Sequence, residues 1–110
     1  MNEKTLFDLL RTILVGTQPI PVAYDHFKEY PDNKVVPPFI LYRNTDTTTI
    51  KADDMVHAKF NNYIVDLVTI SKNVVLEEQL ESLFNSSHLP YDKEEDYLSD
   101  EQIFQIRYFI

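Results

Sequence analysis

Near the beginning of the chain, apolar residues recur at the i, i+3, i+4, i+7 spacing that places them on one face of a helix. Asn2 suits the N-cap, Glu3 suits the positive end of the helix dipole, and Gly16, the single glycine, suits the C-terminal stop. The sequence therefore predicts a helix from Glu3 to Val15. Its apolar stripe is Leu6, Leu9, Leu10, Ile13 and Leu14.

Two strand-like runs follow, Phe39–Arg43 and Phe60–Ile70, and each of them carries apolar residues on both faces of the strand. Strands of this kind are typically central and covered on both sides by helices or neighbouring subunits. The polar segment between them contains no Gly or Pro, and its Ala52-Asp53-Asp54 sequence favours a turn there. Because ordering exposed backbone costs roughly 1–2 kcal/mol per residue, we expect so long a hairpin to contact another subunit.

The last third of the chain predicts a helix and a second hairpin. Asn73 is the expected N-cap of a helix from Val74 to Asn85, whose buried stripe is Leu76, Leu80, Leu83 and Phe84. Strands at 91–97 and 102–109 are expected to be joined by a turn at Ser99-Asp100. In the last strand one face carries Phe104, Ile106, Tyr108 and Ile110.

The prolines between residues 17 and 38 exclude a long helix there, leaving a short edge strand at Val22–Tyr24 as the one regular element expected. The order helix, hairpin, helix, hairpin indicates an α+β fold. We expect two helices packed on a mainly antiparallel sheet of about four strands, with a long β-hairpin arm. At 110 residues, the whole chain is expected to be a single domain.

The net charge of −8 is unevenly distributed. Residues 1–60 carry 8 acids and 7 bases, whereas residues 61–110 carry 10 acids and 3 bases. Phosphate backbones repel such a surface, which argues against direct nucleic-acid binding. Three interpretations stay open: a solvated turn, a docking face for a basic partner, or a mimic of DNA charge. The excess acids are Asp92, Glu94, Glu95, Asp96, Asp100 and Glu101.

The composition also argues against several kinds of segment and site. There is no cysteine, and no apolar run approaches the roughly 20 residues of a membrane span. The acids at the N-terminus argue against a signal peptide, so we expect synthesis in the cytosol. His26, His57 and His88 show no metal-binding spacing. The Asp92, Glu94, Asp96 series lacks the glycine and the final glutamate of a calcium loop. No enzyme, metal or cofactor is expected.

Asp66 is the one acid placed among apolar residues, between Ile64 and Val68. If the second and last strands are neighbours, Arg107 is a cross-strand partner that neutralises it. A place at a subunit contact or at a sheet edge explains the residue equally well.

The central motifs resemble those of the tail terminator (tail completion) proteins of long-tailed bacteriophages, which include tail-to-head joining proteins. They are Pro38-Phe39-Ile40-Leu41-Tyr42, the Ala52-Asp53-Asp54 turn, and Tyr63-Ile64-Val65-Asp66-Leu67-Val68-Thr69. The helix Leu76–Phe84 and the closing strand Ile103–Ile110 complete the pattern over nearly the whole chain. The doubled Pro37-Pro38 and the heavy acidic run at 92–101 depart from it.

This resemblance implies a structural virion protein, made in the host cytoplasm. Such proteins form a homo-oligomeric, typically hexameric ring that caps the tail tube, ends its polymerisation and docks to the head–tail connector. DNA passes through the lumen, and we hypothesise that the acids of this chain line it so that the DNA does not stick. A head-side stopper or adaptor ring, or a small acidic DNA-mimic inhibitor, are the alternatives.

Three groups of residues are the expected contacts. The acidic face comprises Asp92, Glu94, Glu95 and Asp96, and Asp66 is a candidate ring contact. The arm contacts are Arg43, Ile50, Lys51, Asp53, Asp54, Met55 and Lys59.

Overall fold

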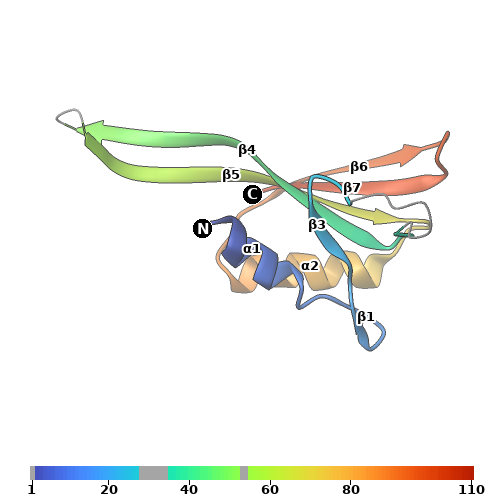
Figure 1. The fold of residues 1–110 in the computed structure, drawn as a ribbon. Coiled ribbons are helices and arrows are strands. Elements are labelled where there is room, and N and C mark those ends of the chain that lie inside the picture. Colours follow the sequence, from blue (N-terminus) through green and yellow to red (C-terminus); the bar gives the residue numbers. More distant parts are fainter. Residues whose placement is uncertain (1, 28–34, 53–54) are drawn as a thin grey trace.

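The computed structural model describes residues 2–27, 35–52 and 55–110, and for residues 50–52 and 55–60 it describes the backbone alone. Its main feature is a five-stranded sheet with the strand order β3-β4-β5-β7-β6, shown in Figure 1. Neighbouring strands are antiparallel, except that β3 runs parallel to β4. The strands are β3 (Val22–Tyr24), β4 (Phe39–Ala52), β5 (Met55–Thr69), β6 (Asp92–Leu98) and β7 (Ile103–Phe109).

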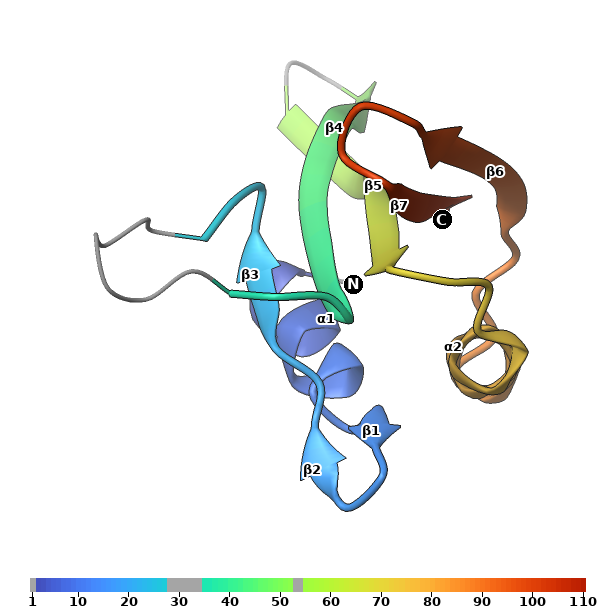
Figure 2. The ribbon, with the colours of Figure 1, turned by 90° about the vertical axis from the view of Figure 1, so that its right-hand side faces the viewer.

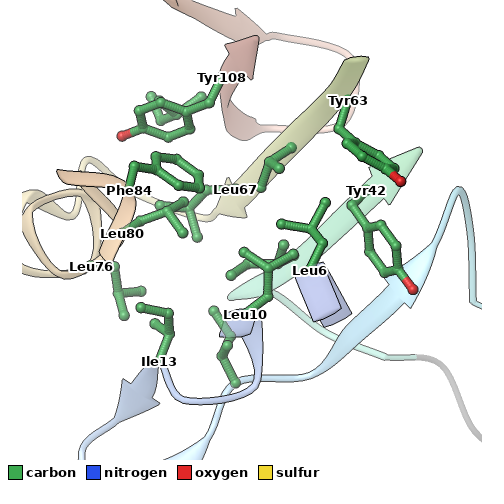
Figure 3. Close-up of a cluster of buried hydrophobic side chains, with 14 residues drawn as sticks. Leu6, Leu10, Ile13, Tyr42, Tyr63, Leu67, Leu76, Leu80, Phe84 and Tyr108 are labelled. Atoms are coloured by element: carbon green, nitrogen blue, oxygen red, sulfur yellow. The ribbon is translucent and has the colours of Figure 1, made fainter. Parts of the chain in front are cut away.

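Helices α1 (Glu3–Leu10) and α2 (Val74–Ser86) lie on the same side of this sheet, as Figure 2 shows. Alternate residues of the central strands point toward the helices and are buried with them (Figure 3). The predicted α+β class is confirmed. The core comprises Leu6, Leu10, Ile13, Ile20, Ile40, Tyr42, Tyr63, Val65, Leu67, Leu76, Leu80, Phe84, Ile106 and Tyr108.

The sheet has five strands instead of about four, because the short β3 joins its edge. Val22 pairs with Ile40 and Tyr24 with Tyr42, and the Ile40 amide donates to the Pro21 carbonyl at 2.9 Å. Since β3 is only three residues long, the prolines beside it cost few hydrogen bonds.

The first helix is shorter than predicted. It is capped by Asn2, whose side chain accepts from the Thr5 amide at 2.8 Å, but it ends at Leu10. The next residues form a small hairpin of β1 (Leu14–Val15) and β2 (Gln18–Pro19). Gly16 has a φ of 63°, which suits the first position of its two-residue turn. The helical spacing of Leu14 was therefore misleading, because this hairpin pairing overrides it.

The second helix and the last hairpin form as predicted. The Asn73 side chain accepts from the Leu76 amide at 3.1 Å and so caps α2. In β7, Ile106 and Tyr108 are buried against the helices. The Phe84 ring meets the Tyr108 ring at 5.4 Å in an edge-on contact, which ties α2 to the sheet.

Candidate functional site

The sheet face opposite the helices, here called the outer face, is covered by neither of them (Figure 2). Its apolar residues Ile64 and Val68 are nevertheless buried, because side chains of both neighbouring strands flank them. Acidic residues occupy its β6 side and Arg43 its β4 side. The outer face carries Phe39, Leu41 and Arg43 on β4, Ile64, Asp66 and Val68 on β5, Gln105, Arg107 and Phe109 on β7, and Asp92, Glu94 and Asp96 on β6.

An ion pair occupies the middle of the outer face. Arg107 Nε donates to Asp66 Oδ1 at 2.8 Å, and Arg107 Nη2 donates to Asp66 Oδ2 at 3.2 Å. These residues are directly opposite each other on β5 and β7, so the proposed cross-strand pairing is confirmed. Its hydrogen bonds to Asp66 raise the pKa of Arg107 above its usual value, and nearby Glu94 and Asp96 add to the effect. The pair fixes the register of two central strands.

This ion pair predicts a measurable coupling between the two side chains. Asp66→Ala and Arg107→Ala should each destabilise the fold by about 1–2 kcal/mol, because the remaining partner loses its charge-assisted hydrogen bonds. The double variant should cost less than the sum of the single ones, and urea unfolding of all four proteins measures the difference. Strictly additive losses would show that the pair contributes nothing beyond its separate parts.

A hollow of about 260 Å³ opens beside this ion pair. It brings the guanidinium groups of Arg43 and Arg107 near a carboxylate and an amide, within walls that are partly apolar. Such a surface suits a protein contact with both polar and apolar groups. Its lining is Asp25, Leu41, Tyr42, Arg43, Ile64, Asp66, Gln105 and Arg107.

The predicted acidic face is divided between the two sides of β6. Asp92, Glu94 and Asp96 are exposed on the outer face, and the described part of the chain provides them with no ion pair. Glu95 points toward the helix side, where its Oε1 atom lies 2.8 Å from Lys72 Nζ. Only three of the four predicted residues therefore share one surface, because neighbouring residues of a strand point to opposite faces.

On the helix side of β6 lies a charged network that the sequence analysis missed. Glu77 of α2 is only 3% exposed, and its Oε1 atom lies 2.8 Å from Lys93 Nζ and 3.0 Å from Lys72 Nζ. Burial alone would raise the pKa of Glu77, but the hydrogen bonds from the two lysines outweigh it and lower the pKa. Glu77 is adjacent to the buried Leu76, a position that could have signalled a buried acid.

Glu81, one turn later on α2, extends this network. Its two carboxylate oxygens accept from the hydroxyl groups of Tyr91 and Tyr108, each at 3.1 Å, and Lys93 Nζ lies 3.3 Å away. Burial raises the pKa of Tyr108 far above its usual value, so this phenol stays protonated and donates. These hydrogen bonds indicate a structural role for Glu81, which attaches the β6–β7 hairpin to α2.

Part of the β4–β5 pair extends beyond the rest of the sheet (Figure 1). Residues 45–52 and 55–62, here called the distal ribbon, pair with each other and with no third strand that the structure describes. Thr45 Oγ1 donates to the Asn62 carbonyl at 3.1 Å, and Thr47 Oγ1 donates to Asn61 Oδ1 at 2.9 Å. The ribbon therefore has two free edges and a braced, polar base.

Among the predicted arm contacts, the structure describes the side chain of Arg43. Arg43 is exposed on β4, next to the base. Asp53 and Asp54 lie outside the described residues, although Ala52 pairs with Met55 on either side of them. The side chains of Ile50, Lys51, Met55 and Lys59 also lie outside the described part.

Neither the arrangement of the described side chains nor the comparisons with known proteins assign a function. Among the side chains that the structure describes, in residues 2–27, 35–49 and 61–110, no three His, Asp or Glu gather as metal ligands would. No described helix has the length and apolar character needed to span a membrane. The chain matches no known family model and no curated protein.

Proposed function

We propose that this chain is a structural virion protein of a long-tailed bacteriophage. In this proposal its copies form a hexameric ring that caps the tail tube, terminates tube polymerisation and joins the tail to the head connector. The observation that carries the proposal is the distal ribbon, a two-stranded extension that pairs with no third strand among the described residues.

A ribbon of this kind is poorly stabilised by its own chain. Isolated two-stranded hairpins are marginal in water, because they bury little apolar surface for the backbone that they order. At roughly 3.3 Å per residue, eight residues reach about 26 Å. That reach is considerable in a molecule of 51 × 32 × 27 Å, and it favours contact with a neighbouring subunit or the tail tube.

The hollow on the outer face and the exposed acids of β6 also have roles in the proposed ring. The hollow beside Asp66 and Arg107 offers a second patch, as a ring needs when different surfaces of successive copies meet. Asp92, Glu94 and Asp96 would line the lumen, where their charge keeps passing DNA from binding. Asp53, Asp54 and Lys51 would contact the tube.

Light scattering of the purified protein across concentration and salt, with negative-stain images, tests this proposal. We expect rings with a central hole, formed either in free solution or when purified tail tubes are added. In the second case the protein should appear only at tube ends. A chain that stays monomeric and never binds tube ends would overturn the proposal.

Two alternatives have tests of their own. A head-side stopper ring would travel with heads, so mixing salt-washed heads and tails in a joining assay separates it from a tail terminator. The exposed row of Asp92, Glu94 and Asp96 also favours a DNA mimic, since alternate strand residues lie about 6.6 Å apart, a spacing comparable to that of backbone phosphates. Competition with DNA for a nuclease or polymerase would support that function.

A further inference from the structure

The free edge of β6 is a regular template for another strand. All seven residues of β6 pair in an unbroken register with β7, and no described strand pairs with the other edge. The first six residues of β6 are exposed. Natural edge strands are usually interrupted by bulges or prolines, whereas this one has only its charge to discourage pairing.

That charge also determines what can pair with the edge. On the outer face β6 presents Asp92, Glu94 and Asp96, while Lys93 and Glu95 are held by the network on the helix side. An added strand places its side chains about 5 Å from those of its neighbour, so an acidic strand is repelled and a basic one is attracted.

The distal ribbon supplies a strand of the required charge. Its β5 portion, residues 55–62, contains His57 and Lys59 and no acid. Its β4 portion, residues 45–52, contains Asp46 as well as Lys51, so it has no net charge and is less suited. No described strand pairs with the β5 edge of the ribbon, because the last backbone hydrogen bonds on that side of β5 join Tyr63 and Ile110.

The two surfaces cannot meet within one molecule. In Figure 1 the ribbon extends to one end, while the β6–β7 hairpin extends to the other. We propose that the β5 edge of the distal ribbon in one copy adds to the free edge of β6 in the next copy, which continues the sheet from subunit to subunit. This head-to-tail contact rests on the proposed ring and specifies its interface.

Charge reversal tests this contact. Lys59→Glu and Asp96→Lys should each raise the concentration needed for assembly about tenfold or more, because each change brings like charges to the shared edge. The double variant keeps the net charge of the natural chain and should recover assembly. Asp96 is suitable because its neighbour on β7 is the uncharged Gln105. Glu78→Lys, on the exposed face of α2, is the matched control and should assemble normally.

Hydrogen exchange distinguishes strand addition from a contact of side chains only. The amides of β6 and of residues 55–62 should become protected together on assembly, while those of α2 stay unchanged. Rings whose double variant fails to recover, or whose β6 amides exchange as fast as in the monomer, would overturn this contact and leave the proposed function standing. If rings form only on tail tubes, protection of β6 that Lys59→Glu leaves unchanged would assign this edge to the tube protein. Failure of the natural chain to assemble at all would overturn both proposals.

Discussion

Replacing residues 45–62 with an Asn-Gly turn should abolish assembly while leaving a folded monomer. Asn44 and Tyr63 are paired, so a two-residue turn can join them directly. In the proposed assembly, the ribbon of each copy contacts the next copy or the tail tube. The shortened protein should therefore form no rings and bind no tube ends, and light scattering and negative-stain images would show this.

The body is expected to survive this change because the core residues that the structure describes all lie outside the ribbon. Helices α1 and α2 pack on the sheet segments from Ile40 to Tyr42 and from Tyr63 to Leu67, which all remain. The free energy of unfolding should change by about 1 kcal/mol or less, since an isolated ribbon is marginal and shortening a loop costs little. Thermal unfolding followed by circular dichroism measures this.

The matched control is Thr48→Ser, which changes an exposed ribbon residue and keeps the ribbon's length. It should assemble normally. A shortened protein that still forms rings would show that assembly uses other surfaces, such as the outer face around Asp66. A shortened protein that unfolds would show that the ribbon supports the body.

Local patterns were sufficient to predict much of this fold. The stripe of Leu76, Leu80 and Phe84 and the cap at Asn73 place α2 correctly, because spacing and capping act within a few residues. The pairing of Asp66 with Arg107 could also be predicted from the sequence, since an acid between apolar residues requires a partner.

Other features depend on contacts between distant parts of the chain. The first helix stops early because residues 14–19 form a hairpin, and the side chain of Gln79 holds both the amide and the carbonyl of Leu14. Alternation along β6 places Glu95 on the opposite face from its neighbours in the strand by local geometry alone, but no local pattern predicts that it pairs with the distant Lys72. No local pattern reveals that Lys93, sixteen residues later, supplies a cation to Glu77.

Lys93→Met should destabilise the protein by about 2 kcal/mol at pH 7, because Glu77 then keeps its buried charge with one lysine fewer. The loss is smaller than for a buried pair left wholly unpaired, since Lys72 remains 3.0 Å from Glu77 Oε1. Methionine keeps most of the apolar stem of Lys93, so packing beside the Tyr108 ring changes little. Urea unfolding measures the difference.

The pH dependence of the stability lost in Lys93→Met tests whether the charge of Glu77 causes this loss. Because the folded pKa of Glu77 is lowered, its ion pairs stabilise the protein above the unfolded pKa of about 4.3, and this stability is lost as the pH falls through the folded value. The difference between the natural chain and Lys93→Met should therefore shrink as the pH falls below about 4. Lys4→Met, at an exposed site with no described ion pair, should cost little at either pH.

A second variant separates charge from shape at this site. Glu77→Gln keeps the side chain's size and removes the charge that the two lysines require, so it should reproduce part of the loss at pH 7. Combining Glu77→Gln with Lys93→Met should cost less than the two single losses together, since each removes the same ion pair. A loss from Lys93→Met that stays constant down to pH 3 would instead assign the role of Lys93 to packing against Tyr91 and Tyr108.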